Sequence, residues 1–187
     1  SLGHYAFWDD EADTVIYARA IWDTGDTTAV MGQNICAYRF GGLLTDLKNR
    51  STPPAQYYFI APFYGAAGFD TFWLRFPMAA CGLASILLVV WWLWRSDASL
   101  AFWLVFCLAL LGNVSFFLFN RQCRYYALAT LASLVIVYLY LDFRGWRSVA
   151  GMLVASLVLL TSQYLNYFAL YAALAIDYFC WQRHVRP

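Results

Sequence analysis

Long apolar stretches separated by short polar ones make up the second part of the chain. Each stretch approaches the roughly 20 residues that a helix needs to cross a bilayer. A polar run around Gln163 and Asn166 interrupts the last and longest stretch and predicts a turn there. The pattern therefore predicts five membrane-spanning helices, at residues 76–94, 100–119, 125–141, 148–162 and 165–181.

The first part of the chain has a different pattern. Between residues 5 and 25, apolar residues recur at helical spacing: Val15, Ala18, Ile21, Trp22. Charges interrupt this stretch, so we expect an amphipathic helix that lies on a membrane rather than crossing it. Asp9 or Asp10 is the expected N-cap, and Gly25 is the expected end of the helix.

A polar region at residues 26–52 follows, with a short helix expected at 43–47. Thr52 and the next two prolines then resemble a helix start, with Thr52 as the cap. The aromatic run that follows, up to Gly68, predicts a second surface helix, because tyrosine is enriched at membrane interfaces.

These elements predict an all-α fold: a polytopic transmembrane helical bundle with an outer loop that contains amphipathic juxtamembrane helices. The outer loop is expected at residues 1–72 and the transmembrane part at 73–187. Composition agrees, since 63% of residues are hydrophobic and 12% are charged. A soluble domain would need many more charges to cover its surface.

The sequence begins without methionine, and we expect a further span to precede it.

Charge predicts the orientation of the spans. The loops on one side contain five arginines and those on the other side contain two: Arg95, Arg144, Arg147, Arg183, Arg186 against Arg121, Arg124. The first side is therefore expected in the cytoplasm. Eight of the eleven acidic residues lie before residue 73, on the opposite side. The expected location is an inner or plasma membrane, multi-pass, with an extracytoplasmic acidic loop.

The acidic cluster at residues 9–13 is the main candidate for chemistry, because four of its five positions are Asp or Glu. One interpretation is a well-capped, solvated helix start. The other is a general base or a cation ligand, since crowded carboxylates can serve acid–base chemistry. Arg75, Arg121 and Arg124 are expected on the same side. They can balance the acids, bind a lipid phosphate, or simply extend to the interface.

Other chemistries find little support. The two histidines lie near opposite ends of the sequence and on opposite predicted sides of the membrane, which excludes a histidine metal site or a Ser-His-Asp triad within this stretch. We see no zinc motif and no phosphate-binding glycine loop. No metal ligands are therefore assigned, although acids in an outer loop can bind a divalent cation.

Three blocks of sequence together resemble one family. The first contains Asp10-Glu11-Ala12, Ala18-Arg19-Ala20 and Gly25-Asp26. The second contains Pro53-Pro54, the aromatic run to Gly68, and Leu74-Arg75-Phe76-Pro77. The third is Asn120-Arg121-Gln122-Cys123-Arg124-Tyr125-Tyr126. Their order and spacing resemble the C-type membrane glycosyltransferases, which include the protein O-mannosyltransferases and the aminoarabinose transferases that modify lipid A.

The resemblance implies an enzyme that transfers a sugar, with inversion, from an undecaprenyl- or dolichyl-phosphate donor on the outer face. The acceptor would be a lipid, a glycan or a protein. Asp10 would be the general base and Glu11 would support it. The substrate-binding residues would be basic, with one tyrosine: Arg19, Lys48, Arg50, Arg121, Arg124, Tyr126. The sequence departs from the family pattern at Thr52, where members often have lysine.

Two other classes remain open. A transporter or flippase would need helix-breaking or ionisable residues near the middle of the spans. A non-catalytic membrane scaffold would need the acids only as helix caps. Within the enzymes, a lipid-linked oligosaccharide transferase of similar architecture is the alternative. No class of nucleic-acid partner is indicated by the charge pattern.

Overall fold

A computed structural model describes residues 2–28, 30–31, 34–35, 48–49 and 52–181. Within these ranges the chain forms eight helices and one pair of two-residue antiparallel strands, which confirms the all-α prediction for the described residues. The elements are α1 (Asp9–Thr24), β1 (Val30–Met31), β2 (Asn34–Ile35), α2 (Ala55–Ala67), α3 (Thr71–Arg95), α4 (Leu100–Gly112), α5 (Val114–Asn120), α6 (Tyr126–Leu141), α7 (Trp146–Ser162) and α8 (Tyr164–Cys180).

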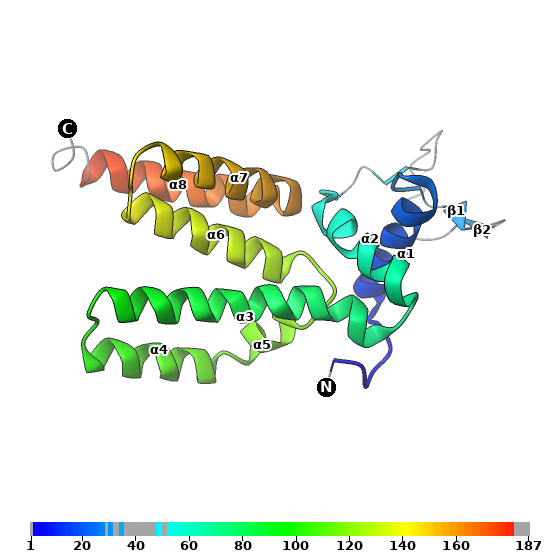
Figure 1. Ribbon diagram of the computed structural model, residues 1–187, viewed down its shortest axis with the longest axis horizontal. Helices are drawn as coiled ribbons and strands as arrows, with labels where there is room; N and C mark the ends of the chain where they lie inside the picture. Colours follow the sequence, from blue (N-terminus) through cyan, green and yellow to red (C-terminus); the bar gives the residue numbers. More distant parts are fainter. Residues whose placement is uncertain (1, 29, 32–33, 36–47, 50–51, 182–187) are drawn as a thin grey trace.

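The helices are arranged in two parts (Figure 1). The first part contains α1 and α2, which pack together beside one end of the second part. The second part is a bundle in which α3 is the longest helix, with α4 on one side and α6 on the other. Helices α7 and α8 pack beyond α6. The loop between α5 and α6 lies at the end of the bundle that meets α1, and this junction contains the candidate site.

Helix α1 begins at Asp9, four residues later than the sequence predicted. Neither Asp9 nor Asp10 is its N-cap. Trp8 occupies that position, and its backbone N–H donates to the Glu11 carboxylate at 3.0 Å. The preceding segment cannot join the helix because the carbonyls of Tyr5 and Ala6 accept hydrogen bonds from a distant arginine. Gly25, with a φ of 80°, ends the helix as predicted.

Helix α2 confirms the second predicted surface helix, but its cap differs. Pro54 is the N-cap, and its carbonyl accepts from the N–H of Tyr57. The Thr52 hydroxyl is instead hydrogen bonded to the Tyr57 hydroxyl and accepts from the side-chain amide of Asn49. The predicted short helix at 43–47 lies outside the described residues.

Helix α3 contains the first predicted span and extends it at the beginning. Asp70 caps the helix, since its carboxylate accepts from the N–H of Trp73 at 2.9 Å. Pro77, near the predicted start of the span, lies inside the helix. The extension matters because it places Arg75 within α3, where the helix holds it beside the start of α1.

The second predicted span is broken, which corrects the sequence prediction. Helices α4 and α5 are bent by 64° relative to each other. Asn113 lies between them, and its side chain accepts from the N–H of Phe116 at 2.9 Å. An asparagine that caps a new helix in this way ends the preceding one.

Helices α6, α7 and α8 lie where the last three spans were predicted. The polar run that predicted a turn contains Gln163, which has extended backbone angles and separates α7 from α8. Among the described helices, α3 is long and apolar enough to cross a bilayer and the bent pair α4–α5 passes the same test only if it is one span, while α6 and α7 are shorter apolar helices, so the five predicted spans are not confirmed.

Two groups of buried side chains hold the fold together. The first joins α1, α2, α3 and the start of α6, with Ala18, Ile60 and Met78 fully buried. The second lies between α6 and α7, where Ile136 and Leu159 are fully buried. The first group fixes α1 against the bundle, and this contact positions the acidic cluster.

Candidate functional site

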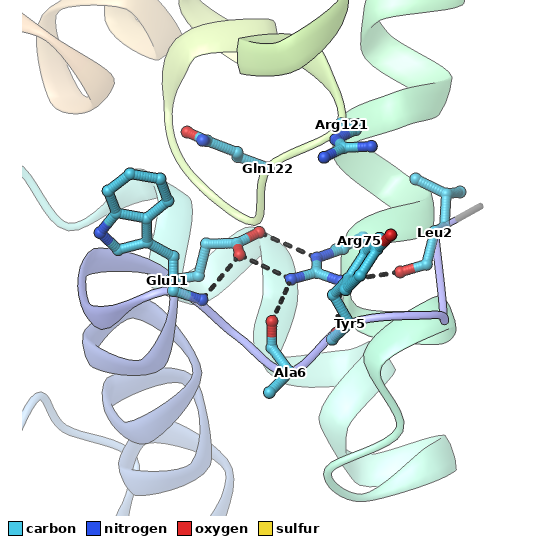
Figure 2. A pocket seen from close by; sticks show the side chains of 8 residues that line it. Leu2, Tyr5, Ala6, Glu11, Arg75, Arg121 and Gln122 are labelled. Carbon is cyan, nitrogen blue, oxygen red and sulfur yellow. Dashed lines mark hydrogen bonds and ion pairs between the residues drawn. The ribbon is translucent and has the colours of Figure 1, made fainter.

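Glu11 and Arg75 form a buried ion pair at the junction of α1 and α3. Glu11 is 3% exposed and Arg75 is 7% exposed. The Nη2 atom of Arg75 lies 2.7 Å from Oε2 of Glu11, and Nε lies 2.9 Å from Oε1 (Figure 2). This two-point contact is the strong geometry for an arginine–carboxylate pair.

The remaining hydrogen-bonding capacity of this pair is directed to the backbone. Nη1 of Arg75 donates to the carbonyls of Leu2 and Tyr5, and Nη2 donates to that of Ala6, each at 2.9 Å. All five donors of the guanidinium are thus engaged. Arg75 therefore balances an acid, one of the three roles that the sequence suggested, and has no donor left for a lipid phosphate.

Glu11 in turn holds the loop that follows α5. Its Oε1 atom accepts from the backbone N–H of Cys123 at 2.8 Å, across 112 positions of sequence. Burial by itself would raise the pKa of Glu11, but the hydrogen bonds from Arg75, Trp8 and Cys123 and the charge of Arg75 together lower it below its ordinary value. Glu11 is therefore a fixed negative charge rather than a group that exchanges protons at neutral pH.

The same environment keeps Cys123 as a thiol. Its side chain is fully buried, and burial together with the nearby negative charge of Glu11 raises its pKa. A neutral buried thiol is a packing residue rather than a nucleophile.

Asp10, the neighbouring acid, is more accessible than Glu11. Its Oδ2 atom lies 2.5 Å from Nη1 of Arg124, and the side chain of Asp10 is 35% exposed. Arg124 is more enclosed, at 17% exposure, and its guanidinium lies 5.4 Å from the ring centres of both Tyr125 and Tyr126. The two neighbouring acids thus have different environments: Glu11 is buried and saturated, while Asp10 is accessible.

The loop between α5 and α6 is held at three successive residues. Glu11 binds the N–H of Cys123, Asp10 binds the side chain of Arg124, and Gln56 of α2 accepts from the N–H of Tyr125 at 3.0 Å. Helices α1 and α2 therefore both hold this loop in place. Gln56 is 2% exposed and was not identified from the sequence, because nothing in a single glutamine indicates a contact 69 positions away.

Asp10 and Arg124 line a cavity of about 360 Å³, which we call the Asp10 cavity. Its other lining residues come from α5, the following loop and the start of α1: Trp8, Glu11, Ser115, Leu118, Phe119, Arg121, Gln122, Tyr126. The lining combines charged and polar groups with the apolar side chains of Leu118 and Phe119 from α5. A mostly apolar pocket with a few converging polar groups is the usual form of a ligand site.

A second cavity of about 320 Å³ adjoins the first. Arg121 and Gln122 line both cavities and lie beside the Glu11–Arg75 pair (Figure 2). Arg121 is exposed, and its side chain forms no hydrogen bond or ion pair with the described residues. It is therefore available to an anionic ligand in either cavity.

Arg19 and Lys48, two of the predicted substrate-binding residues, lie elsewhere. Arg19 pairs with Asp23 at 3.1 Å and lies over the ring of Phe69. Lys48 pairs with Asp26. Neither lines the Asp10 cavity. Arg50 lies outside the described residues.

The structure thus brings the acidic pair of the first sequence block together with the third block, whereas Arg19 of the first block lies elsewhere. Asp10, Glu11, Arg121, Arg124 and Tyr126 meet around one cavity. Trp8 joins them, is 70% exposed, and was not identified from the sequence. A tryptophan directly before the acidic cluster is the signal that could have identified it.

In the part of the chain that the structure describes, no three His, Cys, Asp or Glu side chains gather in a way that suits a metal ion. The charge beside Asp10 is instead supplied by Arg124. No protein-family model, curated protein or solved structure matches this chain.

Proposed function

We propose that the protein is a multi-pass integral-membrane glycosyltransferase that transfers a sugar from a polyprenyl-phosphate donor to an acceptor on the extracytoplasmic face, with inversion. The observation that carries the proposal is the Asp10 cavity. There an accessible carboxylate pairs with Arg124, and Arg121 and apolar side chains of α5 line the same cavity. The resemblance of the three sequence blocks to the C-type glycosyltransferases supports the same conclusion.

The membrane assignment rests on exposed apolar surface as well as on helix length. None of the described residues of α4 or α8 is buried, and both helices are strongly apolar. Leu100, Leu108 and Leu111 of α4 are each about 70% exposed. Such a surface is suited to contact with lipid, because large contiguous apolar patches are unusual on the surface of soluble monomers. Helices of 16 or 17 residues, such as α6 and α7, fall at the short end of spanning length.

The proposed reaction needs one base and one stabilised leaving group. The acceptor hydroxyl gives its proton to a carboxylate oxygen of Asp10, and its oxygen forms a bond to the sugar's anomeric carbon. The bond from that carbon to the donor phosphate breaks, and the lipid phosphate departs with the electron pair. Cationic groups beside the leaving oxygen stabilise the developing charge. Arg121 and Arg124 are the groups placed for that role.

The ion pair between Asp10 and Arg124 links donor binding to this step. A donor phosphate competes with Asp10 for the guanidinium, since both are anions within reach of the same group. Once Arg124 turns to the phosphate, a carboxylate oxygen of Asp10 is freed to accept the acceptor's proton. Glu11 and Arg75 support the arrangement by holding Cys123, the residue before Arg124.

The test is sugar transfer in proteoliposomes with radiolabelled polyprenyl-phosphate sugars. We expect Asp10→Asn to lower kcat by a factor of about 10² or more, because the amide keeps the shape and removes the base. The matched control is Asp9→Asn, which removes the same charge from an exposed neighbour and is expected to retain transfer. Equal activity of Asp10→Asn and wild type would move the base elsewhere.

One observation favours a second candidate, a lipid transporter or flippase. The 64° break between α4 and α5 is the kind of discontinuous helix found in transporters. Movement of labelled polyprenyl phosphate across the bilayer in the absence of an acceptor distinguishes this candidate. Wild-type protein that moves lipid but transfers no sugar from any donor would replace the glycosyltransferase proposal.

A further inference from the structure

A cavity of about 420 Å³ lies beside the start of α2, and among the described residues it shares none of its lining with the Asp10 cavity. We call it the tyrosine cavity. Its walls come from the chain after α1, the chain before α2, α2 itself and the first residue of α8. Helix α8 reaches it because the turn between α7 and α8 lies at the end of the bundle nearest α2 (Figure 1). Two adjacent prolines line it together with Thr27, Asn49, Thr52, Tyr58 and Tyr164.

Hydrogen bonds hold the polar wall of this cavity in place. The backbone N–H of Asn49 donates to the carbonyl of Thr27 at 2.7 Å, and the Thr27 hydroxyl donates to the carbonyl of Asn49 at 3.2 Å. The side-chain amide of Asn49 donates to the hydroxyls of Thr52 and Tyr57, each at 3.1 Å. Tyr57 is 3% exposed and packs against Tyr17 of α1, with ring centres 5.1 Å apart. The wall is therefore fixed to the buried contact between α1 and α2, and a ligand meets a pre-formed surface.

Two tyrosines supply the aromatic part of the lining. Tyr58 of α2 is 49% exposed and Tyr164 of α8 is 46% exposed. Neither hydroxyl forms a hydrogen bond with the described residues. Tyrosines that only anchor a protein at a membrane interface have no need to share a cavity. These two come from helices far apart in the chain and line the same one.

The lining is uncharged among the described residues, which indicates the class of ligand. A phosphate or carboxylate finds no cationic partner here, in contrast to the Asp10 cavity with its two arginines. Hydroxyl and amide groups beside exposed aromatic rings suit a neutral saccharide. Its C–H faces can pack on the rings while its hydroxyls exchange hydrogen bonds with the polar groups. The volume lies in the lower part of the range for small-molecule sites and suits a mono- or disaccharide unit.

We propose that the tyrosine cavity binds a neutral sugar unit of an extracytoplasmic glycan. The sugar lies against the rings of Tyr58 and Tyr164, and its hydroxyls exchange hydrogen bonds with the two tyrosine hydroxyls and with Thr27. The inference goes beyond the proposed function and does not depend on it. A bound glycan holds the protein beside the polysaccharide of the cell envelope whether or not the Asp10 cavity transfers sugar.

Saturation-transfer NMR of the protein in lipid nanodiscs tests the proposal without donor or acceptor. The probes are three uncharged trisaccharides: maltotriose, mannotriose and N-acetylchitotriose. We expect at least one of them to bind at millimolar concentration, with transfer to its ring C–H protons. Absence of binding by all three overturns the proposal. The competing occupant is an extended peptide, since aromatic-lined grooves also bind proline-rich segments. Decaproline that binds more tightly than every trisaccharide, and that loses affinity in Tyr58→Ala, would replace the glycan site with a peptide site.

Substitutions of single tyrosines test the location. Tyr58→Ala and Tyr164→Ala are each expected to raise the dissociation constant of the bound trisaccharide by about five- to tenfold, because each removes one ring contact. Tyr58→Phe keeps the ring and is expected to keep most of the affinity. The matched control is Tyr178→Ala, since Tyr178 is 44% exposed near the other end of α8 and is expected to have no effect on binding. Equal affinities of wild type and all these variants place the sugar elsewhere and overturn the proposal.

A measurement on the wild-type protein avoids any effect of substitution on folding. Tyr58 and Tyr164 are accessible to nitration by tetranitromethane, which mass spectrometry locates. We expect a bound trisaccharide to reduce nitration of both tyrosines and to leave that of Tyr178 unchanged. Undiminished nitration of Tyr58 and Tyr164 at a trisaccharide concentration that saturates the NMR signal contradicts the proposed site.

Discussion

At the scale of single residues, the adjacent acids Asp10 and Glu11 have different environments because successive residues of a helix point in different directions. Glu11 faces inward and is bound by Arg75 and by two backbone N–H groups. Asp10 faces the cavity and shares one oxygen with Arg124. Residues one position apart on a helix do not share a face, so an acidic pair naturally supplies one buried and one accessible carboxylate.

The buried pair makes a specific contribution to stability. Glu11→Gln leaves Arg75 as a buried cation without its counter-charge, and breaking such a pair costs about 3–5 kcal/mol of unfolding free energy. Denaturant titration of the detergent-solubilised protein measures this loss. Asp9→Asn, which removes an exposed acid from the same turn, is expected to change the unfolding free energy by less than about 0.5 kcal/mol.

The lowered pKa of Glu11 also predicts how stability depends on pH. Its stabilising effect is fully present above the unfolded value of about 4.5 and is lost as pH falls through the lower folded value. Unfolding midpoints of wild type between pH 7 and pH 3 are therefore expected to fall more steeply than those of Glu11→Gln. Parallel curves for the two proteins would show that this carboxylate does not contribute to the acid transition.

At the scale of elements, the contact between α3 and α5 depends on a glycine. A Cβ atom at Gly82 would lie 2.7 Å from Cβ of Asn120, a separation that real Cβ atoms do not show. The small residue therefore permits α5 to approach α3 closely. Close approach of helices at small residues is common in membrane bundles.

Gly82→Ala is thus expected to be destabilising, by about 1–3 kcal/mol, the usual cost of overpacking. Gly112→Ala is the matched control, because nothing lies within 4 Å of the added methyl group. Thermal unfolding of the two variants in the same detergent measures the difference. Similar melting temperatures for both would mean that α5 moves away from α3 at little cost.

At the scale of the whole molecule, the polar junction of α1, α2 and the α5–α6 loop lies at one end of an apolar bundle. Arg144, in the loop between α6 and α7, and Arg147, in the first turn of α7, lie at the opposite end. This separation is consistent with a junction on the outer face and a basic, cytoplasmic end, the arrangement that the arginine distribution predicted.

Cysteine accessibility in intact cells tests this orientation. Asp9→Cys is expected to react with a membrane-impermeant maleimide from outside, because Asp9 is exposed beside the outer junction. Arg147→Cys is expected to react only after permeabilisation. The native Cys107, exposed on α4, is expected to remain unlabelled in both conditions, since lipid would cover it. Labelling of Arg147→Cys in intact cells would reverse the proposed topology.

Many features of this protein could be predicted from its sequence, because they depend on neighbouring residues. The apolar stretches placed α3, α6, α7 and α8, and Gln163 marked the turn between the last two. Gly25 ended α1, because a local conformation with positive φ decided that boundary. The acidic pair was identified as the candidate site for the same reason: its residues adjoin in the chain.

Tertiary structure decided what depends on distant partners. The sequence could not show that Arg75 binds the carbonyls of Leu2, Tyr5 and Ala6, or that Asn113 ends α4 within an apolar stretch. The sequence also could not show that Asp10 is accessible and Glu11 is buried. Their partners, Arg124 for Asp10 and Cys123 for Glu11, are more than 110 positions away in the chain. Periodicity and local conformation are properties of a segment, whereas the pairing of a buried charge depends on which segments the folded chain brings together.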